Sequence, residues 1–434
     1  MTFAEQSAAP RASFRALVGE SARIGFLGFG GPAGQIALMH RIFVDERKWV
    51  DEDTYLHSLN YCMLLPGPEA QQLAAYIGWR LHGVKGGLAA GLLFVAPGAA
   101  LILALSWIYA AYGAAPAIVA GFYGVKAAVL AFVVEAFAKI GRRALKTRLD
   151  AAVAAASFAV LTLFGAPFPL IVLAAMAAGY VWAKPHAPAK APEAARAPAG
   201  APVKTALVWA FVWLAPLAAS FVLLGPDHLL TKVGALFATL AVVTFGGAYA
   251  VLAYLAQQAV DAQGWLTAAQ MVDGLGLAET TPGPLVLVNQ FVGFLAGWQA
   301  QGGGPAIALA AAAMASWQTF APSFLWIFAG APYADRLRSN PRAAGALRMV
   351  TASVLGVIAS LAFWFAAHVL FIRTAPATTP WGHVVAAPDL LSLDPYAALI
   401  AAAAAVALIR FKANAILVVL AAAAAGYVPQ LLGR

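Results

Sequence analysis

The sequence predicts an all-α integral membrane protein that crosses the bilayer many times. Of its 434 residues, 62% are hydrophobic and only 10% are charged, whereas soluble globular chains carry about 25% charged residues. The mean hydropathy is +0.80. Apolar segments long enough to cross a ~30 Å hydrocarbon core recur from end to end. They are rich in Ala and Leu and lack the alternation of a barrel strand, so spanning helices are the predicted architecture.

The predicted helices fall into two similar sets. The first set comprises residues 14–44, 52–82, 84–112, 116–140, 150–164 and 168–183. An unpaired helix at 205–224 precedes the second set, which comprises residues 229–260, 265–299, 304–331, 342–372, 387–409 and 413–432. Since a helix needs about 20 residues to span the bilayer, we expect about 10–13 membrane segments, some of them interrupted.

Motifs of the first half recur in the second half at a constant distance. An offset of 216 (282 − 66) relates FGG at 29–31 to FGG at 245–247, Trp49 to Trp265, and PGP at 66–68 to PGP at 282–284. After a nine-residue insertion around QAQGGGP, an offset of 225 (341 − 116) relates Pro97 to Pro322 and Pro116 to Pro341. The sequence therefore predicts two homologous repeats, 1–183 and 205–434. A Pro- and Ala-rich basic linker at 184–204, expected in the cytoplasm, joins them.

Loop charges predict opposite orientations for the two repeats. In the first repeat the loop at 110–116 is uncharged and the next loop, at 139–148, is strongly basic. In the second repeat the loop at 333–342 carries several Arg residues, and the following segment, at 368–388, carries only Arg373. Because Lys and Arg concentrate in cytoplasmic loops, equivalent loops face opposite sides of the membrane. The two repeats are thus predicted to have inverted topology.

Other features limit the class of function. The formal net charge of +9 comes from short basic clusters between apolar segments, which indicate topology rather than a nucleic-acid surface. The lone Cys62 excludes an internal disulfide and a multi-cysteine metal site. The N-terminus has no cleavable signal pattern, so the first helix is expected to direct insertion. Metal-ligand spacings, GxSxG, HExxH and nucleotide-binding glycine loops are not found. This favours a cofactor-free carrier driven by an ion gradient, with an intramembrane enzyme as the alternative.

The glycine and proline motifs mark the candidate site. Inverted repeats with helices broken at matching positions are typical of secondary transporters. Pro removes an N–H donor and Gly permits unusual dihedral angles, so we expect helix breaks at Pro32, Pro66 and Pro282. The half-helices that begin near Pro68 and Pro284 would direct N–H groups at an anion. The alternatives are a proline kink for PGP and close helix packing for FGG, but two copies in register favour binding.

Ionisable residues at membrane depth are further candidates. Lys126 is either a cationic ligand for an anion or half of a structural pair with a carboxylate from another helix. Glu69 and Glu279 lie beside the two PGP motifs. They are either proton carriers, whose charge is tuned by burial, or groups that cap the nearby backbone. The mixed charges of residues 40–53 are expected to form a solvated loop.

Four long motifs point to a known family. FGGPAGQIALMH, LNYCMLLPGPEAQQLAAYIGW, FGGAYAVLAYLAQQAV and DGLGLAETTPGPLVLVNQFVGF resemble the chromate ion transporter family in its long, two-domain form. The resemblance covers both halves of the chain. It implies a multi-pass inner-membrane protein that exports chromate by exchange or proton coupling and confers chromate resistance. A homodimer is left open.

The resemblance also implies which positions form the substrate site. The motif positions are Gly30, Gly31, Gln35, Asn60, Gly67, Pro68, Gln72, Gly246, Gly247, Thr280, Thr281, Gly283, Pro284 and Asn289, to which Lys126 is added. Chromate is a tetrahedral oxyanion, and the half-helix starts with the Gln and Thr side chains would supply donors. Sulfate has the same shape and charge, so a carrier of another oxyanion is the alternative. The expected partners are an oxyanion and the lipid bilayer.

Overall fold

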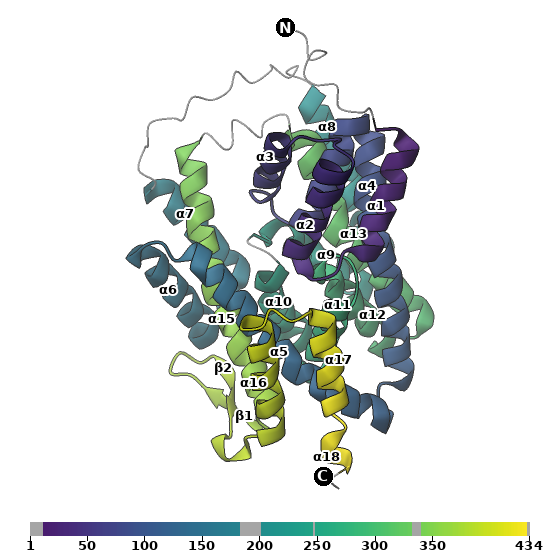
Figure 1. Ribbon diagram of the computed structural model, residues 1–434. Coiled ribbons are helices and arrows are strands. Elements are labelled where there is room, and N and C mark those ends of the chain that lie inside the picture. The colour runs from purple at the N-terminus through teal and green to yellow at the C-terminus, as the bar shows by residue number, and fades with distance from the viewer. Residues whose placement is uncertain (1–11, 183–200, 246–247, 332–339, 432–434) are drawn as a thin grey trace.

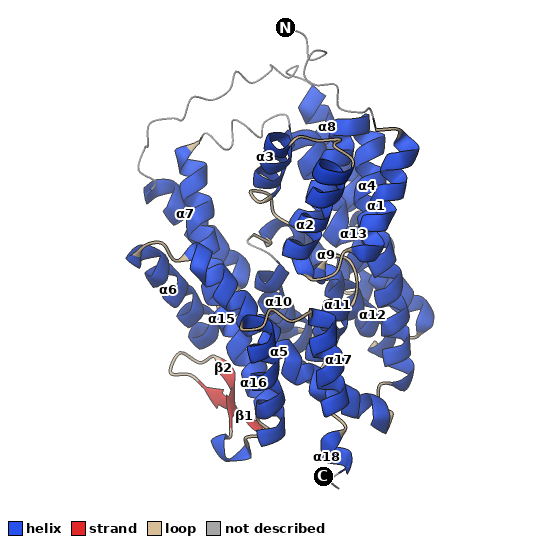
Figure 2. Cartoon of the chain, viewed as in Figure 1, coloured by secondary structure: helices blue, strands red, loops and turns tan. Residues whose placement is uncertain are grey.

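The protein is almost entirely helical (Figure 2). The computed structural model describes residues 12–182, 201–245, 248–331 and 340–431, and the following statements concern those residues. Four helices are long and apolar enough to cross a membrane: α4 (Glu69–Tyr112), α5 (Pro116–Ala144), residues Val203–Leu224 of α8 (Ala201–Leu224) and α15 (Pro341–Leu370). The prediction of an all-α polytopic membrane protein is confirmed. Residues 201–204 of the predicted linker belong to α8, and residues 184–200 lie outside the described residues.

The segment predicted as one helix at 14–44 is a hairpin. α1 (Phe14–Leu27) is followed by α2 (Gly31–His40) and a π-helical continuation at Arg41–Glu46. Glu46 and Arg47 contact Arg23 and Glu20 of α1, so the two arms are antiparallel. The 14 residues of α1 extend only ~21 Å, which is less than the ~30 Å hydrocarbon core. α1 is therefore too short to cross that core on its own.

A second hairpin surrounds the first PGP. α3 (Glu52–Cys62) and the 69–81 part of α4 are its arms, and the rings of Tyr61 and Tyr76 lie 5.6 Å apart across it. α4 then leaves the helical conformation at His82 and Gly83, at the predicted boundary. The chain reverses there, and the two parts of α4 pack closely against each other: a Cβ on Gly86 would lie 2.1 Å from the carbonyl oxygen of Gly78.

The second half of the chain repeats this order of elements. Its elements are α9 (Leu229–Val243), α10 (Ala248–Ala256), a π-helical segment (Gln257–Ala262), α11 (Ala268–Thr280), a 3-10 turn (Leu285–Leu287), α12 (Val288–Gln299) and α13 (Pro305–Gly330). The first and last residues of the two π-helical segments are related by the same offset of 216 (257 − 41). A Cβ on Gly274 would lie 2.3 Å from the Phe291 ring, so α11 and α12 also form a hairpin. The inverted orientation stays a prediction.

The remaining helices pack around α5 and α15. α6 (Arg148–Phe164) and α7 (Phe168–Trp182) pack against α15, while α16 (Pro395–Ile409) and α17 (Ala415–Ala425) pack against α5. α18 (Val428–Leu431) ends the described chain. Figure 1 shows α1, α2 and α3 at one end of the molecule and α16 to α18 at the other. Asp150 of α6 pairs with Arg348 of α15 at 2.9 Å.

One predicted helix boundary is wrong. The helix expected at 387–409 begins only at Pro395, where Asp394 caps it. The preceding residues form an antiparallel sheet of β1 (Thr374–Thr378) and β2 (Val384–Pro388), followed by a 3-10 turn at Leu390–Ser392. Pro388 cannot donate a backbone hydrogen bond, and Asp389 and Asp394 accept bonds from the N–H groups that follow them, so these residues favour turns over a continuing helix.

Candidate functional site

The two PGP turns, residues 66–68 and 282–284, are each held by the other repeat. The Gly67 N–H donates to the carbonyl oxygen of Thr244 at 2.8 Å, and the Gly283 N–H donates to the carbonyl oxygen of Gly28 at 3.0 Å. The offset of 216 relates Gly67 to Gly283 and also Gly28 to Thr244. Both glycines in the turns have positive φ angles, 116° and 96°, which other residues rarely adopt. The same bond is therefore made twice, in reciprocal directions.

The turns also pack closely against the long helix of the other repeat. A Cβ on Gly98, in the 84–112 part of α4, would lie 2.1 Å from the carbonyl oxygen of Pro282. At the equivalent contact, between the first PGP turn and the long helix α13 of the second repeat, a Cβ on Gly67 would lie 3.8 Å from the Oγ of Ser323. Gly98 and Ser323 are related by the offset of 225. Each turn thus lies at a contact between the repeats.

Two of the predicted glutamines stabilise the turns. Nε2 of Gln35 donates to the carbonyl oxygens of Gly28 at 3.0 Å and of Gly283 at 2.6 Å, so this side chain joins α2 to the second PGP turn. Nε2 of Gln72 donates to the carbonyl oxygen of Pro66 at 2.7 Å. The structure therefore places Gln35 at the second PGP turn, which contains Gly283, and Gln72 at the first, which contains Gly67. It also shows that the N–H groups of Gly67 and Gly283 are engaged in this conformation.

Donors for an anion lie one step further along the chain. α4 begins at Glu69 with Pro68 as an N-cap that makes no side-chain bond, and the 3-10 turn after Pro284 likewise lacks a side-chain cap. The first N–H groups of a helix have no acceptor within it. Gln71, in the first turn of α4, is fully buried, and neither polar atom of its side chain has a partner among the described residues. Unpartnered buried amides are rare, so Gln71 is a candidate that the sequence did not single out.

Comparison with known proteins identifies the family to which these turns belong. A sequence model of the chromate transporter family matches residues 15–180 and 231–427. The chain belongs to the chromate transporter family. This confirms the resemblance predicted from the motifs, and the family is one of transporters rather than enzymes. No solved structure matches the chain.

Three curated relatives support the family assignment. A chromate transport protein of Cupriavidus metallidurans is 30% identical over 356 residues, which are 81% of this chain and 82% of the relative. A chromate transport protein of Pseudomonas aeruginosa is 33% identical over 358 residues, 80% of each chain. A probable chromate transport protein of Synechococcus elongatus is 30% identical over 362 residues, covering 81% of this chain and 84% of the relative.

Other predicted positions of this transporter are less directly placed for binding. The hydroxyl of Thr280 donates to the carbonyl oxygen of Leu277, and that of Thr281 to Ala278, so both bond within α11. Asn289 donates to Thr319 at 3.0 Å. Asn60 lines a polar pocket of about 540 Å³ that is also lined by Asp53, Thr54, Leu56, His57 and Arg80. Gly30 and Gly31 form the turn between α1 and α2, with Pro32 in the first turn of α2. Gly246 and Gly247 lie outside the described residues.

The two predicted carboxylates differ in their surroundings. Oε1 of Glu279, in the last turn of α11, accepts a hydrogen bond from the Tyr249 hydroxyl of α10. Glu69 is the first residue of α4, and its carboxylate has no ion-pair partner among the residues that the structure describes. Both side chains are half-buried.

Lys126 has a partner that the sequence did not identify. Its Nζ lies 3.6 Å from Oδ1 of Asp273 on α11, and Oδ2 of Asp273 accepts a hydrogen bond from the Tyr109 hydroxyl at 2.7 Å. Lys126 was interpreted either as a ligand for an anion or as half of a structural ion pair. In this conformation it forms the ion pair. The sequence did not join Asp273 to Lys126 because the two residues lie in different repeats, 147 positions (273 − 126) apart.

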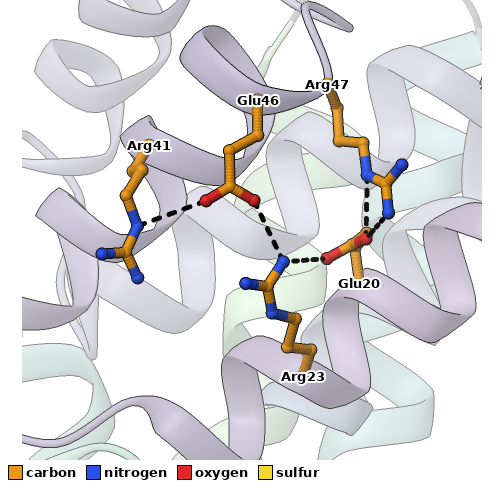
Figure 3. A network of polar contacts seen from close by, with 5 residues as sticks. All are labelled: Glu20, Arg23, Arg41, Glu46 and Arg47. Atoms are coloured by element: carbon orange, nitrogen blue, oxygen red, sulfur yellow. Dashed lines mark hydrogen bonds and ion pairs between the residues drawn. The ribbon is translucent and has the colours of Figure 1, made fainter.

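A group of charged residues joins α1 to the π-helical end of the second arm of the α1–α2 hairpin. We call Glu20, Arg23, Arg41, Glu46 and Arg47 the charged cluster. Arg23 lies between Glu20 and Glu46, at 3.3 and 3.0 Å, and Nε of Arg47 donates to Glu20 at 2.8 Å (Figure 3). The predicted solvated loop is therefore partly paired with α1.

Proposed function

We propose that the protein exports chromate across the inner membrane and so confers chromate resistance, and that the oxyanion binds at the half-helix starts of the two PGP turns, where the repeats contact each other. The proposal rests on the reciprocal bonds Gly67 to Thr244 and Gly283 to Gly28. Two half-helix starts held by opposite repeats give a two-sided site for a doubly charged tetrahedral anion. The curated relatives named as chromate transport proteins support chromate as the substrate.

The test removes one turn at a time. Pro66, Gly67 and Pro68 are replaced by Ala in one variant, and Pro282, Gly283 and Pro284 in another, and chromate efflux is measured together with membrane abundance. Both variants are expected to insert and to lose efflux, because a site between the repeats needs both walls. Pro216→Ala is the matched control, since Pro216 lies inside α8 and belongs to neither turn. Normal efflux by either triple variant would contradict the proposed site.

The choice between chromate and sulfate is tested in vesicles. Sulfate has the same shape and charge, so each anion is added as a competitor for the other. We expect chromate to be exported and sulfate to compete weakly. Transport of sulfate that chromate does not inhibit would instead support the carrier of another oxyanion.

Proton coupling through Glu69 and Glu279 is part of the proposal. A carboxylate that binds and releases a proton during transport should make export depend on pH. Glu69→Gln and Glu279→Gln are expected to weaken this dependence more than they weaken oxyanion binding. Wild-type rates at every pH between about 5.5 and 8.5 would leave these residues only a capping role.

Inverted topology and the division into repeats 1–183 and 205–434 complete the proposal. The chain has a single cysteine, Cys62, which is buried, so Cys62→Ala gives a background for labelling single introduced cysteines. Cysteines in the loops at 139–148, 184–204 and 333–342 should react only from the cytoplasm. Those at 110–116 and 300–305 should react from outside. Labelling of 333–342 from outside would rule out the inversion.

A further inference from the structure

The Lys126–Asp273 pair lies where three helices meet. Asp273 comes from α11, Lys126 from α5 and Tyr109 from the 84–112 part of α4. Only 5% of the Asp273 side chain is exposed, whereas 26% of the Lys126 side chain is. A buried carboxylate needs a compensating charge or a proton. Here the compensating charge is on a long side chain that also reaches solvent-accessible space.

The pair is incompletely formed. The 3.6 Å between Lys126 Nζ and Asp273 Oδ1 is within ion-pair range but too long for a hydrogen bond. Oδ1 is buried and has no hydrogen-bond partner among the described residues, whereas Oδ2 is occupied by the Tyr109 hydroxyl. One carboxylate oxygen is therefore held in place and the other is free to accept a proton.

Few other charges act on Asp273. α4, α5, α12, α15, α17 and the 3-10 turn at Leu285–Leu287 pack against α11. α12, α17 and the 3-10 turn contain no charged residue. On α5, Lys139 pairs with Glu135 at 2.6 Å, and on α15, Arg348 pairs with Asp150. Among the described residues, the charged or titratable groups in ion-pair or hydrogen-bond contact with the Asp273 carboxylate are Lys126 and Tyr109.

The location suits an ion on its way to or from the turns. Asp273 precedes Thr281 by eight residues, or ~12 Å along α11. A Cβ on Gly276 would lie 2.3 Å from Val125, so α5 touches α11 between Asp273 and the second PGP turn. Lys126 thus stands beside the helix arm that leads to that turn.

We propose that the oxyanion and a proton replace the two partners of this pair. The oxyanion binds the Lys126 ammonium, Asp273 separates from it, and Oδ1 of Asp273 takes up a proton from the bulk solution while Oδ2 keeps the Tyr109 bond. Without that proton, the oxyanion would face a second negative charge in a site of low polarity. Oxyanion binding and proton binding therefore favour each other, and by linkage the effect is reciprocal. The inference rests on the proposed oxyanion transport and adds Asp273 as a third proton-binding carboxylate.

The experiment measures oxyanion affinity against pH. Purified protein in vesicles is assayed for chromate transport between pH 6 and 8, and chromate-induced thermal stabilisation is measured in detergent as an independent readout of binding. If one proton binds with each oxyanion, the affinity of the wild type for chromate falls by up to about tenfold for each unit by which the pH rises. Asp273→Asn should remove most of this slope, and Tyr109→Phe should change it less. Lys126→Met should weaken binding at every pH.

The controls separate this role from a structural one. Asp150→Asn removes another buried carboxylate that is paired with a cation, Arg348, and Tyr123→Phe removes another tyrosine bonded to a carboxylate, Asp394. Both are expected to lower abundance without changing the slope. A wild-type slope in Asp273→Asn would overturn the inference while leaving oxyanion transport intact. A wild-type protein that neither binds nor transports chromate or sulfate would overturn the proposed function and this inference together.

Discussion

The two repeats keep the same PGP turns but differ in their first hairpins, α1–α2 and α9–α10. In the first repeat this hairpin carries the charged cluster (Figure 3). The equivalent positions of the second repeat hold no charge, and they are Leu236, Thr239, Gln257, Ala262 and Gln263. The turns, in contrast, have the same three residues and make the same inter-repeat bond.

The difference follows from what each region contacts. Each PGP turn packs against the other repeat, so a change in one turn disturbs both repeats. The charged cluster pairs within the first repeat, whereas Gln257 of the second repeat donates to the carbonyl oxygen of Gly165 in the first repeat at 3.4 Å. The medium around these positions also differs between the two sides of a membrane. If the topology is inverted, the charged cluster faces the cytoplasm and the five uncharged equivalent positions face outward, as the positive-inside tendency favours.

The largest expected effect comes from breaking the symmetry at the turns. Gly98→Ser introduces a Cβ that meets the carbonyl oxygen of Pro282 at 2.1 Å, so the backbone must move. We expect a loss of about 1–3 kcal/mol of stability from overpacking and loss of most transport, because the second PGP turn is displaced. Efflux normalised to membrane abundance measures the effect.

The reciprocal change is the matched control. Ser323, at the equivalent position of the second repeat, already has a Cβ, and its buried hydroxyl has no partner among the described residues. Ser323→Ala is therefore expected to be nearly neutral. Equal losses of transport in Gly98→Ser and Ser323→Ala would show that the two contacts are equivalent, contrary to the packing.

The sequence predicted the positions of the turns but not the path of the chain between them. Gly and Pro located the breaks, and α4 begins at Glu69, directly after Pro68, where expected. A break is compatible both with a kinked spanning helix and with a hairpin, because both interrupt the same backbone bonds. Only contacts such as Arg47 with Glu20, 27 residues apart, distinguish the two.

Side-chain partners across helices were the least predictable part of the site. Lys126 was singled out because its charge is conspicuous in an apolar helix, whereas Asp273 lies in the other repeat, and no local pattern joins them. Gln71 was read only as part of a motif, since nothing in a sequence shows that an amide will be left without a partner. Strands β1 and β2 were missed because five residues each give too short a pattern.

An intermediate effect is expected from the charged cluster. Only 8% of the Glu20 side chain is exposed, and it accepts bonds from Arg23 and Arg47. Glu20→Gln should destabilise the protein by about 1–3 kcal/mol, because bonds to a charged group are lost. Arg41→Gln is the control. Arg41 is largely exposed, and its Nε lies 3.5 Å from Oε1 of Glu46, so we expect this variant to lose only about 0–1 kcal/mol of stability. Thermal unfolding in detergent measures both, and equal shifts would contradict the importance of burial.

The smallest expected effect concerns a pH-dependent contact that the second repeat lacks. His40, at the polar end of α2, lies 2.6 Å from Glu52 at the start of α3, so it joins the two hairpins of the first repeat. The equivalent positions are Ala256 and Ala268. The hydrogen bond to Glu52 raises the pKa of His40 above its usual value of about 6.5. The charged pair therefore stabilises the folded protein fully below that usual value, and the contribution is lost as the pH rises through the raised pKa.

Replacing His40 isolates this contribution. The unfolding temperature of the wild type should exceed that of His40→Gln at pH 5.5 to 6 and approach it as the pH rises toward 8, a window around the usual histidine pKa. Because 30% of the His40 side chain is exposed, solvent screening limits the difference to under about 1 kcal/mol. Ala256→Gln, at the equivalent position of the second repeat, should give a difference from the wild type that does not vary with pH. If the difference in unfolding temperature between the wild type and His40→Gln instead widens as the pH rises, its sign is wrong for a pKa raised by Glu52. The contact between His40 and Glu52 would then not help to hold the first two hairpins together.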